Sequence, residues 1–368
     1  METDCGTGRV IYLDYQSTTP LAPEARDAML PWLTADGSAN PHSSHVAGRA
    51  AKAAVELARE QVAALLPKEG RVIFTSGATE AINLAIKGCG RTVGALSTEH
   101  AAVLDCVAYL GGQVIPVNAN GASDRADFPD IGLPDVGLFA AMLVNNEIGV
   151  IQNIAAYAEA AHANGALMLC DAVQGYGRIP IPDGPDLIAI SAHKIYGPKG
   201  IGALWVRDGV KLEPLIHGGG QEQGLRSGTL SPALCAGFGA AAALAAVRMD
   251  EDSDHVERLW GVAVDRLTGW QINGSVTHRY RGNLNIRRTG LDVARIISEL
   301  RDVAISAGSA CASGSGRPSH VLSAIGLTKV EAQSSLRIGF GRYTTEAELI
   351  EGIDCIRAAA DMQLDQAV

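Results

Sequence analysis

Lys194 is the residue whose position most strongly suggests chemistry, because it closely follows the apolar segment Leu187–Ile190 at the end of a predicted strand. A charged amine is costly to desolvate in such a place. Desolvation lowers the pKa of an amine and makes it a nucleophile, which can form a Schiff base with a carbonyl compound. The alternative is an exposed lysine beside the Gly-Pro loop Ile195–Gly200, and position alone does not decide between the two.

Polar residues also follow two other apolar segments. Asp171 comes after Ala166–Cys170, with Gln174 three residues on, and is either a helix cap or an acid that pairs with a protonated pyridine nitrogen. The turn Thr75–Glu80 opens a helix, where free N–H groups suit a phosphate, although an ordinary N-cap gives the same pattern. On the functional interpretation, three groups follow strands in this order along the chain: a turn that binds phosphate, an acid that pairs with a pyridine nitrogen, and a lysine that forms a Schiff base.

Cys311 stands in a segment, residues 306–316, that is composed almost entirely of Gly, Ala and Ser. Such a composition favours mobility, and a nucleophile on a mobile loop can attack sulfur in one place and deliver it in another. The alternative is a linker that includes a cysteine by chance. The other six cysteines, which we expect to be inert and buried, are Cys5, Cys89, Cys106, Cys170, Cys235 and Cys355.

The number and spacing of the cysteines also bear on the cellular setting. Seven is an odd number, and no CxxC pair occurs. A disulfide framework and a structural zinc site are therefore both poorly supported, and a reducing, cytoplasmic setting fits best. The residues Met1–Arg9 contain no apolar core, so no signal peptide is predicted.

The elements that must position these residues alternate between short apolar strands and helices, from about residue 70 to residue 207. The predicted strands are Arg71–Thr75, Val93–Leu96, Gln113–Val117, Leu138–Val144, Ala166–Cys170, Leu187–Ile190 and Ala203–Val206. The predicted helices are Thr79–Lys87, His100–Leu110 and Ile154–Asn164. This alternation predicts an α/β fold with a mainly parallel sheet covered by helices on both faces. In such a sheet, functional residues gather at the carboxyl ends of the strands.

The character of the chain changes after Val247. Met249–His255 is acidic and is predicted to be a linker or the start of a helix. Beyond it, the strands Asn283–Ile286 and Leu336–Gly339 and the helix Asp292–Leu300 suggest a smaller α+β unit. We therefore predict a large domain over residues 14–250 and a small C-terminal domain over residues 251–368.

Charge and hydropathy argue against two classes of partner. The net charge of −10 argues against nucleic acid, because phosphate binding favours a basic face. The longest uncharged segment, Ser227–Val247, is mostly alanine after its first residues. With an N-cap at Ser231 and a proline at Pro232, it predicts a buried helix and not a membrane span.

Motifs along nearly the whole chain resemble the class V aminotransferase family of fold-type I pyridoxal 5′-phosphate (PLP) enzymes, and specifically the cysteine desulfurases of the NifS/IscS type. The matching segments are Tyr12–Tyr15, Ser76–Glu80, Thr98–His100, Val144–Gly149, Ser191–Gly200, His217–Gly220, Arg226–Thr229, Gly308–Cys311 and Gly341–Thr344. The resemblance implies a fold-type I PLP-dependent transferase in which residues 1–13 pack on the small domain.

The resemblance also implies a role for each matching position of the cofactor site. Lys194 resembles the lysine that binds PLP as a Schiff base, Asp171 the partner of the pyridinium nitrogen, and Gln174 the contact to the ring hydroxyl. His100 resembles the histidine that stacks on the ring and handles the proton of the substrate thiol. Phosphate contacts are implied at Ala78, Thr79, Ser191 and His193, and at Thr229 from the neighbouring subunit of a homodimer.

Two further positions resemble the residues that bind the substrate. Asn146 matches a residue that contacts both cofactor and substrate, and Arg337 matches the arginine that clamps the substrate carboxylate. A planar carboxylate is best held by a bidentate guanidinium. From the residues alone, a surface ion pair is the alternative for Arg337.

The implied reaction is the removal of sulfur from L-cysteine, which gives L-alanine and a persulfide on Cys311. The sulfur would pass to an acceptor protein such as an iron–sulfur scaffold or a sulfurtransferase, for iron–sulfur cluster assembly, tRNA thiolation or DNA phosphorothioation. No resident metal is implied, and Cys311 is at most a transient iron–sulfur ligand. Longer relatives have a C-terminal extension that docks the scaffold, whereas this sequence ends at Val368, which puts that partner in doubt.

Two rival interpretations come from different classes of protein. The first is a selenocysteine lyase or another class V PLP enzyme such as an aminotransferase, which would not need Cys311. The second is a non-catalytic subunit that only binds a sulfur-transfer or tRNA-modification partner. The presence of Lys194, Asp171, His100 and Cys311 argues against the second interpretation.

Overall fold

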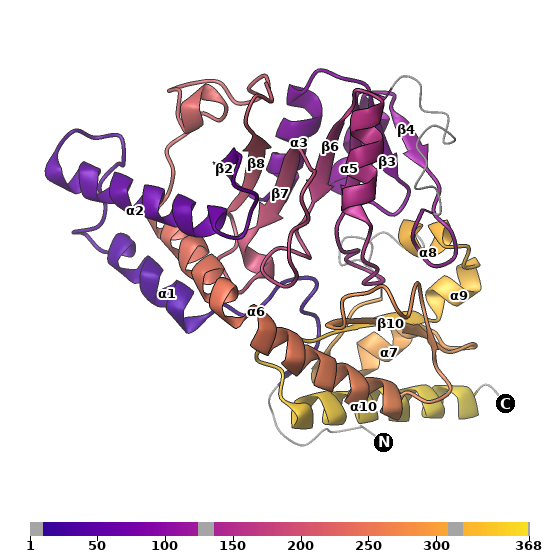
Figure 1. Cartoon of the computed structure of the whole chain (residues 1–368). Coiled ribbons are helices and arrows are strands. Elements are labelled where there is room, and N and C mark those ends of the chain that lie inside the picture. Colours follow the sequence, from indigo (N-terminus) through magenta and orange to yellow (C-terminus); the bar gives the residue numbers. More distant parts are fainter. Residues whose placement is uncertain (1–9, 124–135, 308–318, 367–368) are drawn as a thin grey trace.

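A seven-stranded sheet positions most of the predicted site residues (Figure 1). The structure, a computed structural model, describes residues 10–123, 136–307 and 319–366. In the described chain the strand order is β2-β8-β7-β6-β5-β3-β4, and β8 alone runs antiparallel to its neighbours. The strands are β2 (Gly70–Thr75), β3 (Val93–Leu96), β4 (Gln113–Ile115), β5 (Leu138–Met142), β6 (Leu167–Asp171), β7 (Leu187–Ser191) and β8 (Gly202–Arg207). The predicted α/β fold with a mainly parallel sheet is confirmed.

Helices cover both faces of this sheet, which explains why its strands are continuous apolar runs. Leu169 of β6 and Leu204 of β8 pack toward α3 and α4. Cys170, the residue after Leu169 in β6, packs toward α2, α5 and α6 on the opposite face. The covering helices are α2 (Val46–Ala63), α3 (Ala78–Gly88), α4 (Ala101–Tyr109), α5 (Ile154–Ala163) and α6 (Pro232–Arg266). Successive side chains of a strand point to opposite faces, so each strand contributes to two cores.

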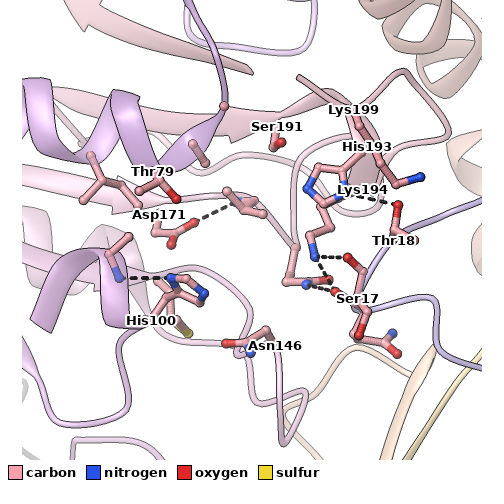
Figure 2. A pocket seen from close by; sticks show the side chains of 18 of the residues that line it. Ser17, Thr18, Thr79, His100, Asn146, Asp171, Ser191, His193, Lys194 and Lys199 are labelled. Atoms are coloured by element: carbon pink, nitrogen blue, oxygen red, sulfur yellow. Dashed lines mark hydrogen bonds between the residues drawn. The ribbon is translucent and has the colours of Figure 1, made fainter. Parts of the chain in front are cut away.

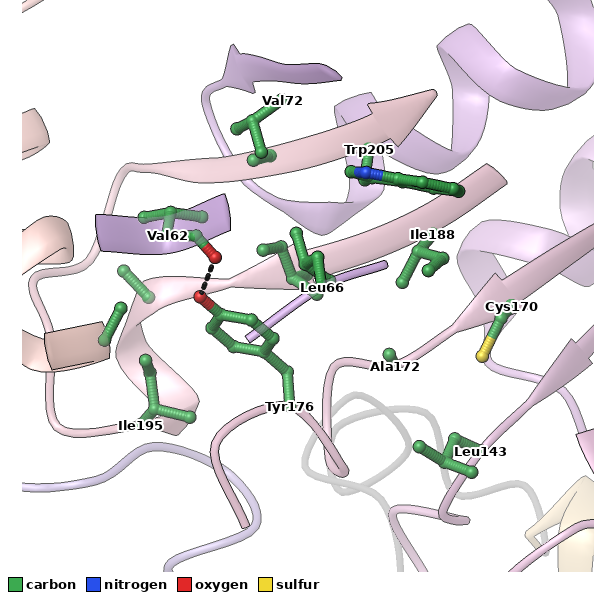
Figure 3. Close-up of a cluster of buried hydrophobic side chains, with 14 of the residues drawn as sticks. Val62, Leu66, Val72, Leu143, Cys170, Ala172, Tyr176, Ile188, Ile195 and Trp205 are labelled. Atoms are coloured by element: carbon green, nitrogen blue, oxygen red, sulfur yellow. Dashed lines mark hydrogen bonds between the residues drawn. The ribbon is translucent and has the colours of Figure 1, made fainter. Parts of the chain in front are cut away.

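Figure 3 shows part of the core between the sheet and α2. Cys170, Ile188 and Trp205, from three neighbouring strands, lie on this side. Tyr176 reaches across the core, and its hydroxyl donates a hydrogen bond of 2.7 Å to the main-chain oxygen of Val62. The one polar atom of this buried ring is therefore satisfied, which removes the penalty of burying it.

A second core lies under a smaller antiparallel sheet of order β12-β10-β9, against α7 and α10. The short strands β1 and β11 pair in parallel beside it, so the chain near Ile11 packs here. The elements are β1 (Ile11–Tyr12), β9 (Gln271–Ile272), β10 (Asn283–Arg287), α7 (Val293–Glu299), β11 (Val303–Ala304), α8 (His320–Ala324), α9 (Lys329–Gln333), β12 (Ser335–Gly339) and α10 (Glu346–Asp365).

Helix α6 runs without interruption through the segment that was predicted to be a linker or the start of a helix. It begins where predicted, since Ser231 Oγ accepts a hydrogen bond from Leu234 N. The acidic residues after Met249 continue it because Glu251 and Asp252 lie three and four residues from Arg248 and pair with it. A linker at this point is therefore wrong. The division into domains at residue 250 stays a prediction.

Helix α6 is also the one helix in the described ranges that is long and apolar enough to cross a membrane, by length and composition. It packs against α10, α2 and α1 (Pro23–Met29), which is followed by the short helix η1 (Leu30–Leu33). Core helices of soluble proteins pass the same test, and the packing of α6 agrees with the predicted buried helix.

Candidate active site

A cavity of about 530 Å³ opens at the carboxyl ends of the strands of the large sheet (Figure 2). Ten of the predicted site residues line it: Ala78, Thr79, His100, Asn146, Asp171, Gln174, Ser191, His193, Lys194 and Arg337. Except for Arg337, which comes from β12 of the small sheet, their place follows from the topology, because parallel strands bring the loops that follow them to one edge of a sheet. Six further lining residues used below are Gln16, Ser17, Thr18, Gly77, Val173 and Lys199.

Lys194 ends the short helix η3 (Ala192–Lys194), which directly follows β7. Its Nζ donates hydrogen bonds of 2.5 Å to Gln16 O and 2.7 Å to Ser17 O. Burial, and then the positive charges of Arg178 and Arg337, lower the pKa of the amine to about 7, against the opposite effect of Asp14 and Asp171. Near neutral pH a large share of this amine is therefore unprotonated and nucleophilic.

Asp171 is the last residue of β6 and is buried beside the cavity. One carboxylate oxygen accepts a hydrogen bond of 3.0 Å from Val173 N, and burial raises the pKa of the carboxyl. Glu99, which is fully buried nearby, also has a pKa raised by burial and then by the charge of Asp171. A protonated pyridine nitrogen would supply the cation that Asp171 lacks among its described hydrogen-bond partners.

The first turn of α3 also lines the cavity. Gly77, Ala78 and Thr79 line it there, and a Cβ built on Gly77 would meet nothing within 4 Å. The N-terminus of this 11-residue helix offers free N–H groups and a favourable dipole. His193 also lines the cavity, on the side of Lys194 and Thr18, with Nδ1 3.2 Å from Thr18 Oγ1. Burial, and then the charges of Lys194 and Lys199, lower the pKa of His193 to about 4, so the ring is neutral.

His100 is the N-cap of α4. Its Nδ1 accepts a hydrogen bond of 3.1 Å from Ala102 N. The nitrogen that accepts carries no proton, so this bond places the proton of the neutral ring on Nε2. Figure 2 shows the ring facing the cavity across from Lys194. In the sequence, the feature that indicates this position of His100 is the start of a predicted helix shortly after the predicted strand Val93–Leu96.

Arg337 lies in β12 and is 1% exposed, although its guanidinium reaches the cavity. Nη1 donates to Asn146 O at 2.8 Å, and Nη2 donates to Asp14 Oδ1 and Ser17 Oγ, both at 2.8 Å. Nε is buried without a hydrogen-bond partner in the described structure. The surface ion pair considered as the alternative is excluded, because the pair with Asp14 is largely buried.

The segment Asp14–Thr18 was not assigned a role from the sequence, yet it contacts both Lys194 and Arg337. It lies more than 170 residues before either of them, so no local pattern could place it there. The signal that could have found it is the motif Tyr12–Tyr15, with which the family resemblance begins.

Gln174 lies in the turn after β6, three residues after Asp171, and its amide has a defined orientation. Nε2 donates to Gln16 O at 2.9 Å, and Oε1 accepts from Arg178 Nη1 at 2.7 Å. Arg178 was also missed from the sequence. It is 8% exposed, and it donates from Nη2 to Lys194 O at 2.7 Å.

Two predicted site residues are not placed at the cavity. Thr229 follows η4 (Glu222–Gly224), is exposed and does not line the cavity of its own chain. Cys311 lies outside the described residues. Of the other cysteines, Cys89, Cys106, Cys170 and Cys235 are free, the first of them only partly buried. Cys355 is disulfide-bonded, which contradicts the expectation that it is an inert thiol.

Comparisons with known proteins agree with this geometry. The aminotransferase class-V family matches residues 11–351. The chain is 42% identical to cysteine desulfurase IscS of Rickettsia akari (strain Hartford), over 95% of this chain and 91% of the relative. The X-ray structure of a NifS-like protein from Rickettsia africae ESF-5 superposes with a TM-score of 0.87 at 30% identity, covering 96% of this chain and 100% of that one.

A structure described as SspA in complex with cysteine superposes with a TM-score of 0.79 at 33% identity, covering 91% of this chain and 99% of that one. The family match extends over far more than half of the residues, from β1 into α10. It includes every residue that lines the cavity. The chain therefore belongs to the aminotransferase class-V family.

Proposed function

We propose that this protein is a cysteine desulfurase that binds PLP on Lys194 and moves the sulfur of L-cysteine to Cys311. The observation that carries the proposal is the buried Lys194 amine, with its pKa lowered to about 7, in one cavity with Asp171 and the N-terminus of α3. The cysteine desulfurase relative and the SspA complex with cysteine support the choice of substrate.

The residues present fit the cofactor. Lys194 would hold it covalently, Asp171 would pair with the ring nitrogen, and the α3 N-terminus with Ser191 and His193 would bind the phosphate. Bound PLP supplies an electron sink for the bonds at the Cα of an attached amino acid. Asp171 supports this role because a carboxylate held in a dry site strongly favours a protonated nitrogen beside it.

Arg337 is suited to bind the carboxylate of the substrate. Its Nε has no hydrogen-bond partner among the described residues, and Asn146 O and Asp14 hold the two terminal nitrogens in place. A guanidinium fixed on two sides loses little further freedom when it binds a planar anion. Asn146 lines the same end of the cavity, where its side chain can orient the bound amino acid.

Two groups of the chain can act on the substrate, one by transferring a proton and the other by donating a hydrogen bond. With cofactor and substrate bound, Lys194 Nζ would be the group that takes the proton from the substrate Cα and returns one. His100 holds a proton at Nε2 in the orientation fixed by Ala102 N. This N–H can donate a hydrogen bond that stabilises negative charge on the substrate sulfur.

The flanks of the Cys311 segment are fixed next to site residues. Before it, Ser306 pairs with the main chain of Arg337, with N–O distances of 2.7 and 3.3 Å. After it, Ser319 Oγ donates to the Glu147 carboxylate, and His320 Nε2 lies 2.8 Å from Glu99 O. Glu147 and Glu99 are the immediate neighbours of Asn146 and His100.

This anchoring supports the sulfur-carrier role of Cys311. Four peptide units separate Ala307 from Cys311, which allows a reach of at most about 14 Å from the anchored strand. In the proposed step, the Cys311 thiolate attacks the substrate sulfur, the substrate C–S bond breaks, and its electron pair with a proton completes alanine. One thiol and one L-cysteine thus give one persulfide and one L-alanine.

Further parts of the proposal concern partners and location. We infer a homodimer in which Thr229 of one subunit contacts the phosphate of the PLP bound by the other subunit. Thr229 is exposed and does not line the cavity of its own chain. The acceptor of the sulfur is a protein such as an iron–sulfur scaffold or a sulfurtransferase. A cytoplasmic location suits a reactive thiol, which a reducing compartment keeps available.

The experiment that tests the proposal supplies the purified protein with PLP, L-cysteine and a reducing agent, and measures L-alanine and sulfide. Equal amounts of both are expected. Cys311→Ser should bind PLP normally but release no sulfide, whereas Cys89→Ser, the same change at a free, partly buried thiol that does not line the cavity, should retain activity. Full sulfide release by Cys311→Ser would refute the carrier role, and absence of alanine with the native protein would refute the proposed function.

A further inference from the structure

Arg178 is a buried cation whose partners in the described structure are all uncharged. It is 8% exposed, and its hydrogen bonds go to Gln174 O, Gln174 Oε1 and Lys194 O. Its guanidinium also lies over the ring of Tyr280, 5.3 Å from the centroid. A buried charge without an opposite charge is costly.

The guanidinium of Arg178 contacts two residues that line the cavity, without lining the cavity itself. One arm donates to Gln174 Oε1 and the other to Lys194 O, both at 2.7 Å. Arg178 itself does not line the cavity, whereas Gln174 and Lys194 do. Arg178 is therefore placed to act through these two residues and not on a bound molecule directly.

The orientation of the Gln174 amide follows from its two neighbours. Arginine has only donors, so the amide oxygen must face Arg178. The main-chain oxygen of Gln16 is only an acceptor, so the amide nitrogen must face Gln16. One N–H of Nε2 remains, and the amide oxygen is turned away toward Arg178.

We propose that Arg178 is a positioning residue that fixes the Gln174 amide so that it presents an N–H group to the cavity, and that ties this amide to the main chain of Lys194. The inference rests on the proposed function, because the group that would receive this N–H is the ring hydroxyl of bound PLP. A donor at this point favours the ionised form of the hydroxyl. The uncompensated charge of Arg178 acts in the same direction.

The consequence is a shift in the ionisation of the bound cofactor, which its visible absorbance reports directly. Arg178→Met releases the amide and removes the positive charge, so the pH midpoint of the absorbance change should rise by roughly one pH unit. Arg207→Met is the control for the loss of an arginine away from the cavity. Arg207 also lies over an aromatic ring, Trp205, and donates to the main-chain oxygen of Pro185, but it does not line the cavity. Its replacement should leave the midpoint unchanged.

A double-mutant cycle tests whether Arg178 acts through Gln174. The pH midpoint is measured for the PLP-bound native protein, Arg178→Met, Gln174→Ala and the double variant. The proposal holds if Arg178→Met shifts the midpoint in the native background and shifts it by less than half as much in the Gln174→Ala background. An equal shift in both backgrounds, or no shift in the native one, overturns it. If Arg178→Met does not fold, Arg178→Lys is used in the same cycle. Lysine keeps the positive charge but lacks the two separate nitrogens that donate to Gln174 Oε1 and Lys194 O.

The failure of this inference is distinguishable from failure of the proposed function. Borohydride reduction followed by mass spectrometry shows whether the native chain holds PLP covalently. If it does not, the proposed function fails and the inference fails with it. If it does and the coupling between Arg178 and Gln174 is absent, only the inference fails.

Discussion

Arg337 Nη2 donates to Asp14 Oδ1 at 2.8 Å, so the guanidinium expected to bind the substrate carboxylate already holds a carboxylate of its own chain. The side chain of Arg337 is 1% exposed and that of Asp14 is 18% exposed. The pair joins β12 to the segment after β1, which are separated by 323 residues. Asp14 thereby neutralises a cation in the cavity before any anionic ligand arrives.

This ion pair predicts opposite effects of two substitutions on the affinity for amino-acid carboxylates. Arg337→Ala should weaken the binding of L-alanine, the expected product, by about 10- to 100-fold, because a charge-assisted hydrogen bond is lost. Asp14→Asn should strengthen it by about 3-fold or more, because the competing negative charge is removed. Titration of the PLP-bound protein with L-alanine, followed by absorbance, measures both. Equal weakening by the two variants would show that Asp14 only supports Arg337 and does not compete.

Lys194→Ala is expected to abolish covalent retention of PLP. Lys199 provides the matched control because it also lines the cavity and lies only five residues further along the chain. After borohydride reduction, the mass of the cofactor should remain on Lys199→Ala and be absent from Lys194→Ala. If the cofactor mass remained on Lys194→Ala and was absent from Lys199→Ala, Lys199 would be the lysine that binds PLP, and the assignment to Lys194 would be wrong.

The rate of PLP incorporation into the cofactor-free protein should depend on pH through the amine of Lys194. Only the unprotonated amine attacks a carbonyl, and the pKa of Lys194 is lowered to about 7. The rate should therefore be low at acidic pH, rise through neutrality and level off a little above pH ~7, far below the ordinary pKa of lysine near ~10.4. Borohydride trapping at timed intervals measures this rate, and a rate that keeps rising to pH ~10 would contradict the lowered pKa.

Thr229 provides a test of the shared site that uses mixed dimers. In a heterodimer of Lys194→Ala and Thr229→Ala chains, one cavity combines an intact Lys194 with an intact Thr229 from the other chain. Cofactor affinity and activity at that cavity should match the native level, giving about half of the native total. If Thr229 acts within its own chain, no cavity is complete, and the mixed dimer should bind PLP no better than the Thr229→Ala homodimer.

The sequence predicted the cavity residues that follow strands, and it did so for a physical reason. Asp171 and Lys194 stand at the ends of apolar runs, and parallel pairing necessarily brings such ends together. Asp14 and Arg178 were missed because their importance depends on contacts made only after folding. The pairing of Asp14 with Arg337 spans the whole chain, and the neutral partners of Arg178 cannot be read from neighbouring residues.

The acidic segment after Met249 was misinterpreted for a related reason. A run of charges with few apolar residues resembles a solvated linker, whereas pairs at helical spacing such as Arg248–Asp252 continue the helix through it. The composition of the segment therefore predicts correctly that it is polar, but it does not predict that the segment is helical.

The continuity of α6 has a consequence for how the molecule unfolds. Its first half contributes Cys235 and Phe238 to the core under the large sheet, and its second half contributes Val256 and Leu259 to the core under the small sheet. A single rigid element is thus shared by two hydrophobic cores, and neither is complete while the helix is frayed. Melting one core exposes the apolar face of a helix that the other core needs, so the two should lose structure in one cooperative step. Cutting the chain at residue 250 should yield two fragments that fold poorly apart.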